Sequence, residues 1–409
     1  MRLATHPATE RPVIKGPILL ILAVATGAVV ANLYFCQPIL PRLASTFHHS
    51  VASLTFVVTA TQIGYAAGLA LLVPLGDLIA RKRLVPAVFL VAALGCLLCA
   101  LAPSLVLFLI ASAIVGMTSV AGQILIPFVA DFAPAERRSR SVARLMSGLL
   151  IGILLARTFS GLLAQSFGWR SVYFASTLTM ACFAALLSWL IPREPKRESM
   201  RYRGLLFAAA TLMIHEPVLR RRSLIGALAF GSFAVLWSSL SWQLSRAPFS
   251  MNSLTIGLFG IIGLAGVFAA NIVGRIADKS RGKTITFQVT LIAGAAILVS
   301  FLLFLFGGMN IFAIVLGVIL LDAGTQGVQL SNQTLIYSSN NQSRSRITSV
   351  YMFSFFLGGT LGSALAGVAL EQSGWRASSL VGLAFSCGVL VLSFSELRRH
   401  QQTESSKAQ

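Results

Sequence analysis

The second half of this chain repeats the first. Three short features of residues 139–170 return 206 positions later: Ser-Arg at 139 and 345, a glycine at 152 and 358, and Gly-Trp-Arg at 168 and 374. Both copies lie in strongly apolar sequence. Two similar apolar halves can face each other in a membrane and rock about a site between them. The repeat therefore favours a carrier far more clearly than it indicates a cargo.

Composition places both halves in a lipid bilayer. Hydrophobic residues make up 56% of the 409 residues and charged residues only 11%, whereas soluble domains carry about 25% charged residues. Apolar runs of about 20 residues, long enough to cross the hydrocarbon core, recur along the chain. We predict an all-α polytopic membrane protein with about twelve transmembrane helices in two pseudo-symmetric six-helix bundles, residues 1–192 and 223–409. The cytoplasmic loop between them, 193–222, carries an apolar stretch at 205–214 that is too short to cross and is expected to lie along the lipid surface.

The net charge of +20 gives the orientation. On this topology, 27 of the 32 lysines and arginines fall in the termini and in alternate loops on one side. Such an excess marks the cytoplasmic side. We therefore expect a multi-pass protein of the bacterial inner membrane with both termini in the cytoplasm. The charge is a topology signal, so we expect no nucleic-acid partner.

The sequence lacks the residues that other classes of membrane protein would need. The five cysteines lie within predicted spans, which argues against a disulfide framework. The five histidines lie outside the spans, which removes a histidine proton relay and any ordinary histidine metal site. No phosphate-binding loop of the form G-x-x-x-x-G-K-[ST] occurs, so a nucleotide-driven pump or membrane enzyme is not expected. A membrane sensor that does not transport would normally carry a soluble output domain, and no loop of this sequence is large enough for one. We predict a non-enzyme without cofactor or metal, working as a monomer.

Two corresponding loops carry a family pattern. The loop after the second span reads Pro-Leu-Gly-Asp-Leu-Ile-Ala-Arg-Lys-Arg from 74 to 83, and the loop after the eighth reads Gly-Arg-Ile-Ala-Asp-Lys-Ser-Arg-Gly-Lys from 274 to 283. This resembles the G-x-x-x-D-R-x-G-R-K loop of the major facilitator superfamily. The resemblance implies a conformational latch, in which each acid sits against the positive end of a neighbouring helix while the cytoplasmic side is closed. The residues implied in this latch are Asp77, Arg81, Lys82, Gly274, Asp278 and Lys279. Alternatively, they are loop charges that end the spans.

Motifs in the first and fourth spans look like a bacterial branch of presumed efflux carriers. They are Ala-Asn-Leu-Tyr-Phe-Cys-Gln-Pro at 31–38 and Gln-Ile-Leu-Ile-Pro at 123–127. Drug:proton antiporters of the superfamily carry G-x-x-x-G-P-x-x-G-G in the fifth span. In this chain Ala156 and Arg157 stand at its Gly-Pro position.

Two ionisable residues lie well inside predicted spans, Arg157 in the fifth and Asp322 in the tenth. Such residues are costly in a bilayer and usually mark function. Asp322 begins a polar stripe with Gln326, Gln329 and Gln333, whose spacings of 4, 3 and 4 place all four on one helix face. The 206-residue offset also relates Gln329 to Gln123 and Gln243 to Gln37. We predict that these residues line a central substrate and proton cavity, with these neighbours: Asn32, Tyr34, Trp237, Trp242 and Asn332.

A buried acid suggests the energy source. Burial disfavours a charged carboxylate and a nearby arginine favours it, so proton binding to Asp322 would differ between two states of the carrier. The sequence thus favours export of a small organic molecule by proton antiport, with a proton-linked or facilitative importer as the alternative. Neutral or cationic amphiphiles suit the acid, and anions suit Arg157. Alternatively, the glutamines join helices, Arg157 extends outward to the membrane surface and Asp322 is a permanently paired structural acid.

Overall fold

The computed structural model describes residues 16–134, 137–192, 202–263, 283–339 and 344–408, and in these ranges the chain is helical without a strand. The first half contains α1 (Gly16–Ala31), η1 (Gln37–Ile39), α2 (Leu40–Phe47), α3 (Thr55–Leu71), α4 (Leu75–Leu78), α5 (Arg81–Leu101), α6 (Leu105–Thr118), α7 (Ala121–Phe132), α8 (Arg138–Phe167) and α9 (Trp169–Leu190). The second contains α10 (Tyr202–His215), α11 (Pro217–Leu244), α13 (Lys283–Gly307), α14 (Ile311–Ser339) and α15 (Arg344–Ala408). Between α11 and α13 lies a short apolar helix, Ser253–Gly263.

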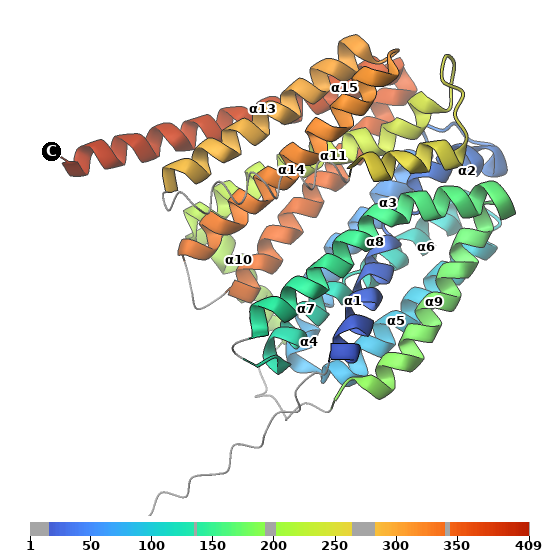
Figure 1. Ribbon diagram of the computed structural model, residues 1–409, viewed down its shortest axis with the longest axis horizontal. Helices are drawn as coiled ribbons and strands as arrows, with labels where there is room; N and C mark the ends of the chain where they lie inside the picture. Colours follow the sequence, from blue (N-terminus) through green and yellow to red (C-terminus); the bar gives the residue numbers. More distant parts are fainter. Residues whose placement is uncertain (1–15, 135–136, 193–201, 264–282, 340–343, 409) are drawn as a thin grey trace, which may run out of the picture.

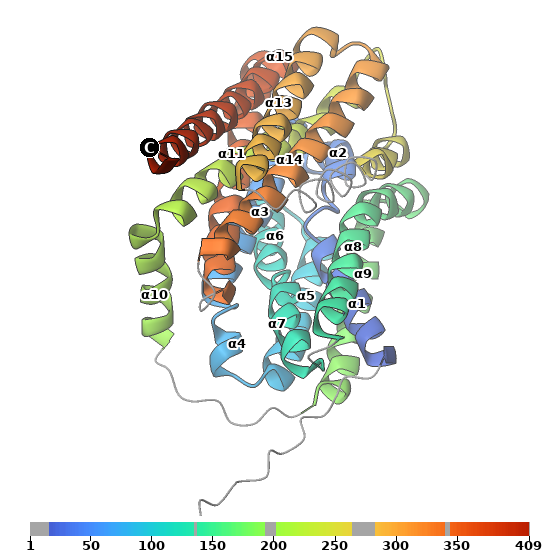
Figure 2. The same cartoon turned by 60° about the vertical axis from the view of Figure 1, so that its left-hand side comes forward.

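The predicted membrane architecture is confirmed. Nine helical segments of the described ranges are long and apolar enough to cross a bilayer, and α1 and Ser253–Gly263 are shorter apolar helices. The last of the nine segments, in α15, contains two helices that meet at Gly374. Figures 1 and 2 show the segments as two bundles, one coloured blue to green and the other yellow to red.

The repeated Gly-Trp-Arg motif forms the reversal between the last two spans of each half. Gly168 and Gly374 have φ values of +82° and +71°, a left-handed region that residues with a Cβ avoid. In each half the tryptophan follows directly in the next helix. The sequence repeat therefore marks a repeated turn.

Within the first bundle, α1 and α8 cross with their backbones in contact. A Cβ added at Gly152 would meet the backbone of Gly27, and one at Gly148 would meet that of Ala23. Small residues allow this approach in membranes, where van der Waals packing supplies much of the helix association.

Polar side chains join the two bundles at one end of the molecule, which we call the Arg42 end. There Arg42 donates from Nε to Ser253 Oγ at 3.1 Å, and Ser53 donates to the carboxylate of Glu371. We call the contact between the two bundles the seam. Deeper along it, the hydroxyls of Thr59 and Ser363 lie 2.8 Å apart. The opposite end, which we call the Arg81 end, carries the starts of α5 and α8 and the end of α7.

Candidate functional site

The two ionisable residues predicted inside the spans lie close together where the bundles meet. Arg157 is 3% exposed and Asp322 is 6% exposed. Trp237 of α11 lies between them: the Arg157 guanidinium carbon is 3.6 Å from the indole centroid, and Trp237 Nε1 donates to Asp322 Oδ1 at 3.2 Å. All three residues are described, and no direct ion pair joins Arg157 to Asp322. The indole connects the two charges.

The break after α1 supplies two further partners of the cation. Gln37 Oε1 accepts a hydrogen bond from Arg157 Nε at 2.6 Å, and the ring centroid of Tyr34 lies 4.8 Å from the guanidinium carbon. The hydroxyl of Ser241, in α11, donates to the Gln37 carbonyl. The first bundle thus presents the cation and its amide partner, whereas the second presents the indole and the acid.

Glycines of the short helix Ser253–Gly263 complete the enclosure. A Cβ at Gly260 would lie 3.0 Å from Cβ of Arg157, and one at Gly263 would collide with the Asp322 carboxylate. Both polar side chains therefore rest against bare backbone.

Arg157 retains an unused donor. Its Nη2 is buried and has no hydrogen-bond partner among the described residues. Burial of an unpaired donor costs free energy, and the rings of Tyr34 and Trp237 already lie against the guanidinium. The site can therefore accept one more oxygen-bearing group, from water or from a cargo.

The glutamine stripe leads away from this cluster along α14. Asp322 is buried, whereas Gln326, Gln329 and Gln333 are half-buried. Because α14 continues towards the Arg81 end, the stripe extends from Asp322 in that direction. On α7, Gln123 is also half-buried, and its Nε2 donates to the Tyr65 hydroxyl at 3.4 Å.

Four other predicted cavity residues have partners elsewhere. Gln243 donates to the Gly308 carbonyl at 2.7 Å, and Asn32 accepts from Ser176 at 2.6 Å. Trp242 packs beneath the Arg246 guanidinium, 4.0 Å from ring centroid to carbon. Asn332 donates to the Arg222 carbonyl at 3.1 Å. None of these contacts includes Arg157 or Asp322.

Sequence reasoning missed the burial of Arg222. The sequence predicts Arg222 in the cytoplasmic loop 193–222, but α11 begins at Pro217 and Arg222 is 1% exposed. It forms an ion pair with Glu396 of α15 and donates to Asn332 Oδ1 at 3.3 Å. The only sequence signal is an acid just beyond the last predicted span.

The described latch residues gather at the Arg81 end. Asp77 is exposed in α4, and Lys82 is half-buried in the first turn of α5. Arg81 is buried and pairs with Asp131 of α7, with 2.9 Å between Nη1 and Oδ2. Gly274, Asp278 and Lys279 lie outside the described residues.

Comparisons with known proteins agree with this architecture. The family model of the Major Facilitator Superfamily matches residues 22–340. The uncharacterized transporter YgaY of Escherichia coli O157:H7 is 38% identical over 366 residues, which cover 89% of this chain and 92% of that protein. The inner membrane transport protein YnfM of Escherichia coli (strain K12) is 26% identical over 370 residues, 88% of this chain and 85% of that protein.

Solved structures share the fold at low identity. A bacterial homologue of the human lysosomal transporter Spinster superposes with a TM-score of 0.76 at 15% identity, over 93% of this chain and 96% of that one. The nucleoside transporter NupG superposes with a TM-score of 0.71 at 16% identity, over 93% and 98%. The family and these relatives are transporters, not enzymes. The chain belongs to the major facilitator superfamily and is a membrane transporter of that family.

Proposed function

We propose that this transporter exports a small organic molecule in exchange for protons, with Asp322 as the proton carrier. The observation that carries the proposal is the stack of Arg157, Trp237 and Asp322 across the junction of the bundles. Arg157 belongs to the first bundle and the other two residues to the second. Rocking of the bundles would therefore change the distance between a buried cation and a buried acid.

Depth supports this role. At about 1.5 Å per residue, Arg157 lies about 15 Å from the end of α8 and Asp322 about 16 Å from the start of α14, both measured from the Arg42 end. These distances are half of a hydrocarbon core of about 30 Å. A charge at that depth is costly, so its proton occupancy depends strongly on which neighbours it has.

The transport cycle follows from opening and closing of the contact between the bundles at the Arg42 end. With the Arg42 end closed, Asp322 has Trp237 as a donor and Arg157 nearby. When that end opens, Arg157 moves away with the first bundle and outside water can reach the acid. A proton bound there favours the return, and cargo enters from the Arg81 end. A gradient drives such a cycle only if the proton binds the two states differently.

The same proposal includes the orientation and the cargo class. We place the Arg81 end in the cytoplasm of a bacterial cell, in the inner membrane, with a monomer as the working unit. The half-buried glutamines of α14 lie along the path from that end to Asp322. An acid with aromatic and amide neighbours suits neutral or cationic amphiphiles, and the free Nη2 of Arg157 suits an oxygen acceptor on the same molecule.

The critical experiment is proton flux in everted membrane vesicles energised by respiration. A pH-sensitive dye reports proton release when a panel of organic cations, neutral amphiphiles and organic anions is added. We expect at least one compound class to release protons with the wild type. Asp322→Asn should lose that response while the vesicles still bind the compound, and Asp322→Glu should retain part of it.

Glu371→Gln is the matched control. It removes a carboxylate at the Arg42 end but leaves an oxygen that accepts from Ser53, so the proton response should persist. An undiminished response in Asp322→Asn would refute the role of Asp322. Uptake assays in right-side-out vesicles distinguish export from import, because uptake driven by an inward proton gradient would make the protein an importer.

A further inference from the structure

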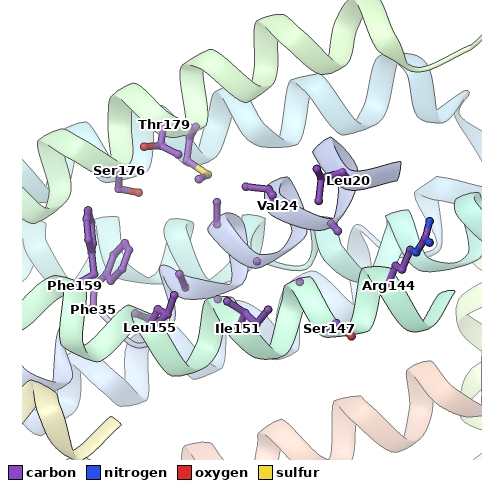
Figure 3. A pocket seen from close by; sticks show the side chains of 18 of the residues that line it. Leu20, Val24, Phe35, Arg144, Ser147, Ile151, Leu155, Phe159, Ser176 and Thr179 are labelled. Atoms are coloured by element: carbon purple, nitrogen blue, oxygen red, sulfur yellow. The ribbon is translucent and has the colours of Figure 1, made fainter. Parts of the chain in front are cut away.

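A second site lies on the flank of the first bundle, away from the seam. A groove of about 790 Å³ runs between α8 and α9 with α1 as its floor. Figure 3 shows Leu20 and Val24 of α1 between the side chains of the two walls. In Figure 1, α1 is visible between α8 and α9, and α8 lies on the side of the second bundle. The groove therefore opens laterally, where a bilayer would meet the protein.

Local sequence explains why the groove is hollow. The helices α8 and α9 are joined at the tight turn of Gly168, at the Arg42 end. The α1 floor lies against α8 through Gly27, Gly148 and Gly152, which contribute no side chain to fill the space. The walls are apolar and open: Ile151 is 55% exposed, Leu155 52% and Phe159 46%.

The groove ends at a cluster of cations. Arg144 lines it at the Arg81 end. Arg140 precedes it by four residues on the same face of the helix, and Arg137 lies directly before the first residue of α8. All three side chains are exposed, and none forms an ion pair with a described carboxylate. One face of α8 is thus basic for its first two turns and then apolar along the groove.

Dimensions place this change at a membrane surface. The 30 residues of α8 span about 45 Å, longer than a hydrocarbon core of about 30 Å. Arg144 lies six residues from the start of α8, about 9 Å along the axis. From Arg144 to Phe159 the groove follows the helix for about 22 Å, more than the depth of one leaflet.

We propose that this groove binds an anionic phospholipid from the leaflet at the Arg81 end. The headgroup phosphate pairs with Arg144, with Arg140 and Arg137 adding positive potential, and one acyl chain lies along α1 between Ile151 and Leu155. Arginine suits phosphate because its guanidinium donates two parallel hydrogen bonds. The acyl chain would cover the apolar surface of the groove that the glycines of α1 and α8 leave without a side chain.

The internal repeat supplies a control for the charge. The position 206 residues after Arg144 is Val350, which is 8% exposed and packed in the core. The position equivalent to Leu155 is Leu361, which is 58% exposed on α15. The second bundle therefore offers a similar apolar stripe without a cation at the position of Arg144, the residue that pairs with the headgroup in this proposal, and we expect no headgroup preference there.

Native mass spectrometry of the full-length protein in detergent tests the proposal. The probes are phosphatidylglycerol and phosphatidylcholine with identical acyl chains. The wild type should retain one phosphatidylglycerol at least about fivefold more strongly than phosphatidylcholine, the preference expected from one basic residue at a surface. Arg144→Gln should lose the preference, and Leu155→Trp, which plugs the groove, should lose the bound lipid.

Two matched variants should bind lipid like the wild type: Arg83→Gln, an exposed arginine of the same end outside the groove, and Leu361→Trp, the plug at the equivalent position. If Leu155→Trp fails to fold, Val24→Phe takes its place. Soluble glycerol phosphate should not displace the lipid, because it has no acyl chain; displacement would make the site a phosphate site. Equal retention of the two lipids by the wild type, or an unchanged preference in Arg144→Gln, would overturn the proposal.

Discussion

Arg157 and Arg222 are both buried, but they differ in how far the sequence reveals their burial. Arg157 stands alone in apolar sequence, so its burial could be predicted from the span that contains it. Arg222 follows Arg220 and Arg221, and a run of three arginines is indistinguishable from a solvated loop end. Its burial depends on α13, α14 and α15, which supply Thr290, Asn332 and Glu396. Tertiary packing therefore decides what local composition cannot.

The Arg222 pair gives a prediction at this scale. Arg222→Met should lower the free energy of unfolding by about 3–5 kcal/mol, because it leaves the Glu396 charge buried without its partner. The double variant Arg222→Met/Glu396→Leu should recover most of the loss, since no unpaired charge remains. Unfolding in mixed micelles measures both. A double variant as unstable as the single one would contradict this explanation.

At the scale of elements, hydropathy predicted the spans but not all of their ends. Loop 193–222 contains α10 and the first turns of α11, and the first span is interrupted after Ala31, so that Gln37 lies in the short helix η1. Average hydropathy does not register where a helix leaves the bilayer or where it unwinds. The Gly-Trp-Arg repeat was visible in the sequence, but its meaning as a left-handed turn required the backbone angles.

The crossing of α1 and α8 can be tested with one methyl group. Gly152→Ala forces the two backbones apart, which should cost about 1–3 kcal/mol of stability and lower the thermal midpoint. Gly204→Ala in α10 is the control, because a Cβ there meets nothing within 4 Å, and its midpoint should stay or rise. Equal midpoints for Gly152→Ala and the wild type would show that the crossing tolerates a wider spacing.

At the scale of the molecule, the repeat predicted two bundles but not which end would be closed. An alternating carrier has two states of similar free energy, and one sequence encodes both. The proximity of Arg157 and Asp322 could be anticipated from their depth, and Trp237 was among the expected neighbours, but its position between the two charges could not be anticipated. The four residues with other partners, such as Gln243 and Asn32, show that the repeat offset and the position in a span do not fix where a polar side chain points.

Closure of the Arg42 end can be followed by crosslinking. Thr59→Cys/Ser363→Cys replaces two hydroxyls 2.8 Å apart on opposite bundles, so mild oxidation should link them whenever that end is closed. If Asp77 latches the opposite state, adding Asp77→Asn should speed crosslinking by removing that competitor. Arg83→Gln, a neighbouring exposed charge, should leave the rate unchanged. Slower or equal crosslinking in the Asp77 variant would argue against the latch.

The seam itself bears on how easily the carrier moves. Thr158 of α8 donates to the Gly257 carbonyl, Gly161 lies against Ser253, and Gly367 lies against Thr55. Hydroxyl groups and exposed backbone lose little free energy when water replaces the opposite bundle, because water restores their hydrogen bonds. Along these contacts, the two bundles can separate without any bulky side chain having to repack. Two such surfaces can part and rejoin as rigid bodies.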